Sequence, residues 1–312
     1  MPMSTPSSQP TLVTPSLLRD WDLPAPGSDK YSRGSVLVLG GARATPGAAL
    51  LAGTAALRAG AGKLTMAVAG SVAVHVGVAL PECGAMAMPE TAEGSLTGEG
   101  LESIASYVDR ADALLIGPGL DDLDLTEVLL RGLLEREEGD GGDGPAILLD
   151  AYALAGLTRV EDMIGPWRGR LILTPNPTEA GVLLGRDVED LEADVAAIAR
   201  RFDAVVSCQG IIAGTVSRGS VESAGPEESA GSPELWKITT GHGGLGTSGS
   251  GDVLAGAIAG LRARGTSGVQ AACWGTHLHA AAADRLASKL GPLGFLAREL
   301  ADEIPALMLE LN

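Results

Sequence analysis

The sequence has 312 residues, a formal net charge of −17, 45% hydrophobic residues and only 3% aromatic residues. So acidic a chain is not expected to bind nucleic acid or anionic membranes generally, because both require clustered positive charge. With few aromatic side chains, the interior must be built from Ala, Val, Leu and Ile, a composition that suits helices packed on a parallel sheet. The 44 glycines are clustered, which favours loops that approach a ligand closely.

Cysteine usage and apolar patterning indicate a cytoplasmic protein. Cys83, Cys208 and Cys273 are far apart in the sequence and odd in number, so reduced thiols are expected. The N-terminal residues lack the basic start and apolar core of a secretion signal. The most apolar stretch, Leu64 to Leu80, is interrupted by glycine and polar residues, so no membrane span is expected.

Residues 1–28 differ in composition from the rest of the chain. They are rich in Pro, Ser and Thr and lack sustained periodicity, which predicts a flexible N-terminal tail or a loosely packed arm. We expect residues 29–312 to form a single catalytic domain, since α/β folds of this size are often one unit.

From residue 35 onward, short apolar runs alternate with helical segments. Strands are predicted at 35–40, 63–69, 113–117, 146–150, 171–174 and 204–207, and helices at 47–60, 122–137, 187–201 and, with breaks, 248–311. This alternation predicts an α/β fold in which a mostly parallel central sheet is covered by helices on both faces. The glycine-rich segments 139–144 and 220–233 are expected to be solvent-facing loops, the second between two β-like stretches.

The strongest chemical signal is the segment GHGGLGTSGSGDVLAGAIAGL at 241–261, in which a Gly/Ser loop leads directly into a helix. The amides of Gly249, Ser250 and Gly251, reinforced by the positive end of the helix dipole, can form a hole for a phosphoryl group. Asp252 can then act as the general base for a substrate hydroxyl. Asp is also a favoured helix cap, but the surrounding glycines favour the catalytic interpretation.

Other glycine-rich turns follow predicted strands. GGARATPGAALLAGTAALRAGAGKLT follows the first strand without matching the dinucleotide-binding spacing, and close helix packing is the alternative explanation for its later glycines. The Gly117-Pro118-Gly119 turn and the segment TPNPTE, with Asn176 and Glu179, also come directly after strands. Because ligands bind at the carboxyl ends of the strands in open α/β sheets, these turns are candidates for a binding site. Glu179 can alternatively serve only the first turn of the next helix.

The four histidines do not predict a metal site. His277 and His279 are two residues apart on an expected helix and therefore point in different directions. His75 and His242 are isolated, and we expect no metal ligands from the protein.

Five stretches taken together identify a family. SRGSVLVLGGARATPGAALLAGTAALRAGAGKLTMAV, ADALLIGPGL, ILLDAYAL, LTPNPTEAGVLLG and GTSGSGDVLAGAIAGL occur in the order seen in the ADP- or ATP-dependent NAD(P)H-hydrate dehydratases, and the chain resembles this family from about Lys30 to Ala306. The resemblance implies a ribokinase-like three-layer α/β/α fold. It also implies that damaged, hydrated NADH or NADPH is restored while ADP is converted to AMP and phosphate.

The resemblance further implies roles for individual residues. Asp252 would activate the hydroxyl of the hydrated nicotinamide ring, and Gly249, Ser250 and Gly251 would stabilise the transferring group. The implied substrate contacts are Ala48, Gly119, Asn176 and Asp252, and the implied nucleotide contacts are Gln209, Gly210, Ile211, Ile212, Ala213 and Gly251. A Mg²⁺ ion that bridges phosphates and a homo-oligomer, often a tetramer, are also implied.

The chain departs from the family pattern at three positions. Gln209 stands where lysine is common, Asn176 where histidine is common in bacteria, and Ser250 where threonine is usual. The loss of a cation at 209 leaves ADP and ATP open as donors, and NADH and NADPH hydrates remain open as substrates. Two alternative functions also remain open: a small-molecule kinase of the same fold, for a sugar or a hydroxyethylthiazole-like substrate, and a non-catalytic nucleotide sensor.

Overall fold

The computed structural model describes residues 9–25, 27–137, 144–215 and 233–311. The predicted loops at 139–144 and 220–233 fall almost entirely outside the described residues. The first eight residues of the predicted tail also fall outside them.

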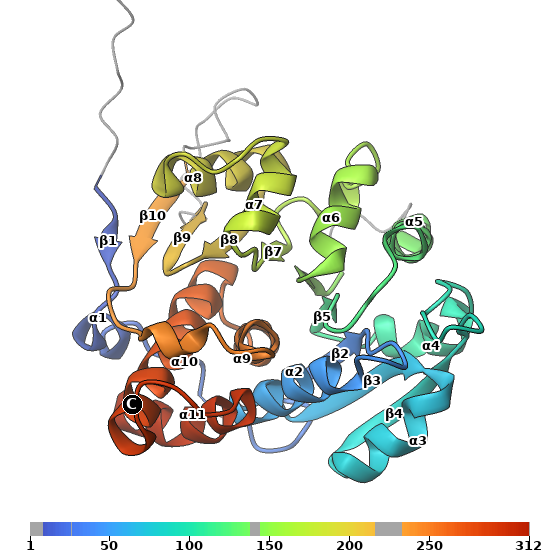
Figure 1. Ribbon diagram of the computed structural model, residues 1–312, viewed down its shortest axis with the longest axis horizontal. Helices are drawn as coiled ribbons and strands as arrows, with labels where there is room; N and C mark the ends of the chain where they lie inside the picture. Colours follow the sequence, from blue (N-terminus) through green and yellow to red (C-terminus); the bar gives the residue numbers. More distant parts are fainter. Residues whose placement is uncertain (1–8, 26, 138–143, 216–232, 312) are drawn as a thin grey trace, which may run out of the picture.

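The described strands form one 10-stranded sheet in the order β1-β10-β9-β8-β7-β6-β5-β2-β3-β4 (Figure 1). All neighbouring strands pair in parallel except β9, which is antiparallel to both β8 and β10. The predicted, mostly parallel sheet is therefore confirmed. The strands are β1 (Thr11–Leu12), β2 (Ser35–Leu39), β3 (Lys63–Ala69), β4 (Cys83–Met88), β5 (Ala113–Ile116), β6 (Ala146–Leu149), β7 (Leu171–Leu173), β8 (Ala204–Cys208), β9 (Ile211–Gly214) and β10 (Glu234–Lys237).

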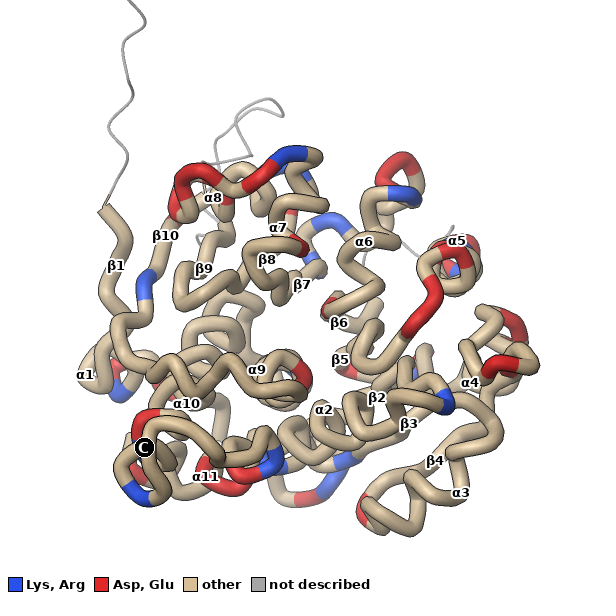
Figure 2. The backbone as a smooth tube through the Cα atoms, viewed as in Figure 1, with Lys and Arg blue, Asp and Glu red and all other residues tan. Residues whose placement is uncertain are grey.

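The central strands are short and apolar because they are covered on both faces. Every residue of β5, β6 and β7 is buried. In Figure 2 the charged residues lie mainly on the outer helices and loops, and the middle of the sheet is almost free of charge. Hydrophobic burial of these strands thus places the polar residues that follow them at the rim of the sheet.

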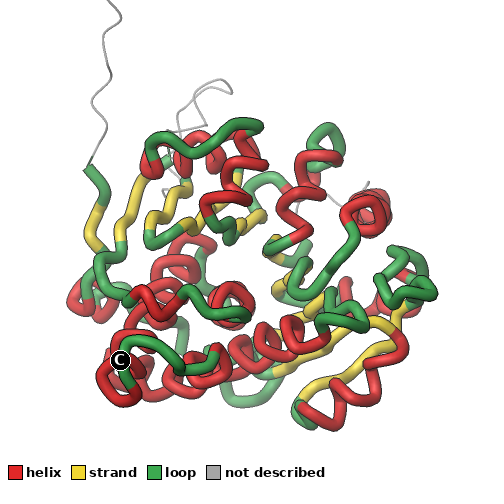
Figure 3. The backbone as a smooth tube through the Cα atoms, in the orientation of Figure 1, coloured by secondary structure: helices red, strands yellow, loops and turns green. Residues whose placement is uncertain are grey.

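The helices form two layers, one on each face of the sheet (Figure 3). One layer contains α2, α9, α10 and α11, and the other contains α5, α6, α7 and α8. This three-layer arrangement confirms the predicted fold class. The helices are α1 (Pro15–Arg19), α2 (Pro46–Arg58), α3 (Gly70–Ala79), α4 (Leu101–Val108), α5 (Leu123–Glu137), α6 (Tyr152–Arg159), α7 (Pro177–Leu184), α8 (Leu191–Phe202), α9 (Ser250–Ala263), α10 (Gly268–Leu290) and α11 (Ala297–Leu311).

Helices α2 and α9 pack unusually closely because small residues meet at their interface. A Cβ atom at Gly256 would lie 2.0 Å from the Ala52 carbonyl oxygen, and one at Gly260 would lie 2.3 Å from that of Ala56. The backbones can approach to this distance only where side chains are absent. This contact fixes the middle of α9 along α2, and both helices also pack against the central strands.

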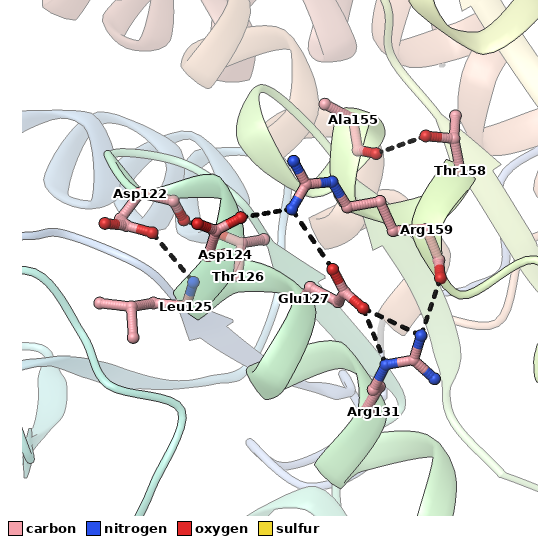
Figure 4. A network of polar contacts seen from close by, with 9 residues as sticks. All are labelled: Asp122, Asp124, Leu125, Thr126, Glu127, Arg131, Ala155, Thr158 and Arg159. Carbon is pink, nitrogen blue, oxygen red and sulfur yellow. Dashed lines mark hydrogen bonds and ion pairs between the residues drawn. The ribbon is translucent and has the colours of Figure 1, made fainter.

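In the layer that contains α5, α6, α7 and α8, a surface network of polar side chains links α5 to α6 (Figure 4). Arg159 on α6 pairs with Asp124 at 2.5 Å and with Glu127 at 3.3 Å on α5, and Arg131 pairs with Glu127 at 2.9 Å. Arg131 also donates to the main-chain carbonyl of Arg159 at 3.0 Å. The exposed fractions of these side chains range from 26% for Glu127 to 87% for Asp124, so solvent screens the pairs and each stabilises the fold by less than about 1 kcal/mol.

Residues 9–25 form an arm packed on the sheet, so the second of the two predicted alternatives, and not the flexible tail, describes this part of the chain. β1 pairs with β10, and Leu18 on α1 is fully buried. The main-chain carbonyl of Trp21 accepts hydrogen bonds from the side chains of Gln270 at 3.0 Å and Trp274 at 3.1 Å. The composition of the arm concealed these contacts because they are made largely by main-chain atoms, which carry no sequence signal.

The apolar stretch from Leu64 to Leu80 divides into β3 and the surface helix α3. Among the described residues, no helix combines the length and apolar character needed to cross a membrane. Cys83, Cys208 and Cys273 are free thiols, as predicted.

Candidate active site

The predicted binding loops meet at one edge of the sheet. β2, β5, β6, β7, β8 and β10 all run in the same direction, so their carboxyl ends share that edge. β2 and β5 are neighbours, yet the chain continues from β2 toward β3 and from β5 toward β6, on opposite sides of this pair. In open α/β sheets, ligands bind outside such a reversal point. A cavity of about 260 Å³ lies at the other edge, beside Arg33 and Gly60, and is separate from these loops.

The loops after β2 and β5 are joined directly. The Gly41 amide donates to the Pro118 carbonyl at 2.8 Å, and the Thr45 hydroxyl donates to the Gly119 carbonyl at 2.8 Å. Gly119 has φ 75°, and a Cβ there would lie 2.4 Å from the Thr45 carbonyl oxygen and 3.2 Å from the Ala48 Cβ. Ala48 and Gly119, two of the implied substrate contacts, are thus brought together, and only glycine fits at 119.

The glycine loop before α9 presents unpaired amides. Gly249, with φ 88°, caps the helix without a side chain, and the Ser250 amide donates to the Thr247 carbonyl at 3.2 Å. Within the part of the chain that the structure describes, the amides of Gly249, Gly251 and Asp252 have no acceptor. Apart from its chain neighbours and the nearby backbone of its own helix, no atom lies within 4 Å of the position of a Cβ on Gly251. These amides, at the positive end of α9, can therefore bind an anion.

Asp252 is the third residue of α9, and its carboxylate turns back toward the glycine loop. Its Oδ2 lies 3.9 Å from the position of a Cβ on Gly249. Burial, reinforced by the negative charge of Glu179, raises the pKa of Asp252 to about 6. A carboxylate with a raised pKa that is still ionised at neutral pH is a competent general base.

Asp150, at the end of β6, is a second buried carboxyl that the sequence did not single out. It is 6% exposed, and its Oδ1 accepts from the Thr174 hydroxyl at 2.8 Å. Burial raises the pKa of Asp150 to about 7, although the hydrogen bond from Thr174 acts to lower it. The negative charges of Asp252 and Glu179 raise this pKa by smaller amounts. The charge of Asp252 opposes ionisation of Asp150. Because the pKa of Asp252 is about 6 and that of the more deeply buried Asp150 is about 7, Asp252 ionises first.

The backbone beside Asp150 is strained. Ala151 has φ 50° and ψ −127°, a conformation that residues with a side chain rarely adopt. The Asp150 carbonyl oxygen would be 1.8 Å from a Cβ on Gly117, so only glycine fits at this position in the neighbouring loop. Such strain is concentrated at functional sites, which supports a role for this edge of the sheet.

Asn176 and Glu179 form a reciprocal cap at the start of α7. Asn176 Oδ1 accepts from the Glu179 amide at 3.0 Å, and Glu179 Oε2 accepts from the Asn176 amide at 2.8 Å. The first-turn interpretation of Glu179 is therefore confirmed. Burial also raises the pKa of Glu179, and its charge acts on both Asp150 and Asp252, so the cap is part of the same electrostatic site.

The implied nucleotide segment has one accessible part. Gln209 and Gly210, with φ 46° and 80°, form the tight turn between β8 and β9, and Gln209 is exposed. The side chains of Ile211, Ile212 and Ala213 are at most 3% exposed inside the sheet. A nucleotide at this edge could therefore reach the side chain of Gln209 and the main chain of the turn.

The histidines are more closely connected to the site than their spacing suggested. His279 Nε2 lies 2.9 Å from the Ser250 hydroxyl oxygen, and both residues are buried. The spacing rule considered only whether His277 and His279 face each other, and it could not reveal a partner on another helix. Among the described residues, no three His, Cys, Asp or Glu side chains are grouped to hold a metal ion.

Comparison with solved structures supports the fold. A ribokinase-like superfamily protein from Enterococcus faecalis matches with a TM-score of 0.78 at 20% identity, covering 99% of both chains. An ADP/ATP-dependent NAD(P)H-hydrate dehydratase from Bacillus subtilis, co-crystallised with ATP and Mg²⁺, matches with a TM-score of 0.72 at 24% identity. That match covers 98% of this chain and 100% of the other, so the fold is ribokinase-like.

Comparison at the sequence level is more specific. The chain is 39% identical over 300 residues to an ADP-dependent (S)-NAD(P)H-hydrate dehydratase from Xanthomonas campestris, covering 95% of each chain. It is also 36% identical to a bifunctional NAD(P)H-hydrate repair enzyme from Moorella thermoacetica, covering 89% of this chain but only 50% of that longer protein. The family model for NAD(P)H-hydrate dehydratase matches residues 36–306. The chain therefore belongs to the NAD(P)H-hydrate dehydratase family.

Proposed function

We propose that the protein is an ADP-dependent (S)-NAD(P)H-hydrate dehydratase, which restores hydrated NADH or NADPH while ADP is converted to AMP and phosphate. The observation that carries this proposal is the placement of the Asp252 carboxylate beside the free amides of Gly249 and Gly251. The family relationship narrows the substrate from any hydroxyl compound to the hydrated nicotinamide ring.

The chemistry follows from these groups. Asp252, ionised above its pKa of about 6, accepts the proton of the ring hydroxyl as that oxygen bonds to the β-phosphorus of ADP. The bond between the β-phosphorus and its bridging oxygen breaks, and AMP leaves. The amides of Gly249 and Gly251 donate to the phosphoryl oxygens as their charge develops. Loss of phosphate from the ring carbon, with loss of a proton from its neighbour, restores the double bond.

Substrate and nucleotide have separate places in this proposal. Ala48, in the first turn of α2, and Gly119 and Asn176, in the segments after β5 and β7, would contact the hydrated nucleotide. The Gln209–Gly210 turn at the end of β8 would contact ADP, leading its terminal phosphate toward Gly251. Ile211, Ile212 and Ala213, which are buried in β9, would then support the backbone of this turn.

Mg²⁺ would enter with the nucleotide. Asp150, Glu179 and Asp252 are negatively charged when ionised, and no Lys or Arg contributes to the pKa shifts described for them. A cation would reduce the repulsion between a phosphate chain and these carboxylates, and Mg²⁺ commonly binds through substrate phosphates and a few carboxylates.

The direct test is recovery of nicotinamide absorbance when hydrated NADH is incubated with the protein, ADP and Mg²⁺. We expect recovery to depend on ADP, and Asp252→Asn to lower kcat by about 10²-fold to 10⁴-fold while ADP binding persists. Asp162→Asn, which removes an exposed carboxylate, is the matched control. A stable phosphorylated product without recovered NADH would indicate a kinase, and ADP binding without turnover would indicate a sensor.

We further propose that the enzyme is cytoplasmic and assembles as a homo-oligomer, with a tetramer as the form implied by the family resemblance. The supporting surface is α3 with the edge strand β4. Val74 and Val78 are 76% and 77% exposed on successive turns of α3, beside β4, whose outer edge pairs with no other strand in the described part of the chain. Light scattering of Val78→Glu tests this assembly, because a charge in an apolar interface should favour smaller species.

A further inference from the structure

The loop that carries the phosphoryl-transfer groups has little side-chain support of its own. Gly249 caps α9 without a side chain. Among the described residues, the hydrogen bond between Ser250 and His279 is the one side-chain hydrogen bond made by residues 246–252. A glycine-rich segment samples many conformations unless neighbouring groups fix it, so this bond has a large share in ordering the turn.

The bond lies in the interior, where its geometry is well defined. Ser250 is 4% exposed and His279 is 7% exposed, and Ser250 Oγ lies 2.9 Å from His279 Nε2. Burial lowers the pKa of His279 to about 4, so the imidazole is neutral at physiological pH and can donate from one ring nitrogen. Loss of the imidazole would leave the Ser250 hydroxyl buried without its partner.

The same helix holds the other end of the loop. Asp284, also on α10, accepts from the Thr240 hydroxyl at 2.8 Å and from the Gly241 amide at 2.9 Å. α10 itself is tied to the sheet through Thr276, whose hydroxyl lies 2.8 Å from that of Ser207 on β8. α10 thus fastens both ends of the loop to the sheet, Asp284 at residues 240–241 and His279 at residue 250.

We propose that His279 is a positioning residue for the reaction, which through the Ser250 hydroxyl fixes the first turn of α9 and so aims the amides of Gly249 and Gly251 and the Asp252 carboxylate. The proposal rests on the proposed function for its kinetic consequences, but the ordering of the loop can be measured independently. Asp284 supports the far end of the same loop, whereas His279 acts directly at the turn that carries the reacting groups. A small displacement of that turn lowers the rate because phosphoryl transfer depends on alignment.

The kinetic test compares His279→Leu, which removes the hydrogen bond, with His279→Gln, whose amide can donate to Ser250. We expect His279→Leu to lower kcat by about tenfold to a hundredfold with a smaller change in the KM for ADP, and His279→Gln to recover part of the loss. His277→Leu is the matched control, because His277 is 6% exposed on the same helix and its Nδ1 has no partner among the described residues. Because the two residues act through one hydrogen bond, the double variant Ser250→Ala/His279→Leu should lower kcat by no more than the more damaging of the two single substitutions.

Hydrogen exchange of the peptide spanning 241–253 provides the measurement that needs no activity. We expect its amides to exchange faster in His279→Leu than in His277→Leu, at temperatures where both variants are folded. Equal exchange in the two variants, an unchanged kcat in folded His279→Leu, or additive losses in the double variant would each overturn the proposal. If the wild type fails to restore NADH while exchange still increases, the proposed function fails and the positioning role stands.

Discussion

The buried carboxyl of Asp150 should make the stability of the fold depend on pH. Its ordinary pKa of 3.8 rises to about 7 in the folded protein, a difference of about 3 units. At about 1.36 kcal/mol per unit, ionised Asp150 costs the folded state up to about 4 kcal/mol. Because the folded-state pKa is raised, this cost is absent below about pH 4, grows as pH rises toward 7, and is complete above it.

Asp150→Asn removes the ionisation while keeping an oxygen that can accept from Thr174. At about pH 8 we expect the variant to unfold with a free energy about 2 to 4 kcal/mol higher than that of the wild type. At about pH 4 the two proteins should be nearly equal, since Asp150 is then neutral in the folded state and largely neutral in the unfolded chain. The stabilisation should therefore appear as pH rises.

Urea unfolding at several pH values between about 4 and 8.5 measures this difference, with equal m values as the sign that only stability has changed. Asp162→Asn removes one exposed carboxylate and controls for the change in net charge. A gain that is constant with pH, or a loss of stability at pH 8, would refute the inference that ionised Asp150 is a cost to the folded state. A loss of stability at pH 8 would mean that a favourable interaction of the ionised Asp150 carboxylate outweighs the cost of its burial.

Three further predictions concern the site and its support. Glu179→Gln keeps the cap on α7 but removes a negative charge that raises the pKa of Asp252. The acid limb of the kcat/KM profile, near pH 6 in the wild type, should therefore move to lower pH. An acid limb that does not move would contradict this coupling. Gln209→Lys adds a cation at the nucleotide turn and should lower the KM for ADP by about threefold to tenfold at low salt, an effect that salt titration should weaken. Gly256→Ala would place a Cβ 2.0 Å from a main-chain carbonyl of α2, so thermal unfolding should show a loss of about 1 to 3 kcal/mol, and an unchanged Tm would argue against this close packing.

The sheet was largely predictable because burial on both faces leaves a strong pattern. The six strands predicted from apolar runs coincide with β2, β3, β5, β6, β7 and β8 to within two residues. β4 and α3 were missed because both lie in segments rich in small apolar residues without a clear period. β1 was missed because it is only two residues long and is held by β10, far away in the sequence.

The site was predictable where chemistry and backbone geometry leave a local mark. Asp252 with its glycine loop, and Gly119 after β5, could be found because glycine is required at their turns. Asp150 and His279 could not be found in this way. The raised pKa of Asp150 comes from burial and from charges on α7 and α9, and the partner of His279 lies 29 positions earlier in the chain. Both properties arise only when separate helices pack on one sheet.

The N-terminal arm has a consequence for how much of the chain the fold requires. A protein trimmed at residue 28 would lose β1 and expose the hydrogen-bonding edge of β10 to other molecules, a common route to aggregation. Trimming would also remove the main-chain carbonyl of Trp21, which accepts hydrogen bonds from Gln270 and Trp274. Both of these residues lie on α10, the helix that holds the catalytic loop. Shortening this end should therefore reduce solubility and, through α10, loosen the glycine loop before α9, which lies far from the arm in the sequence.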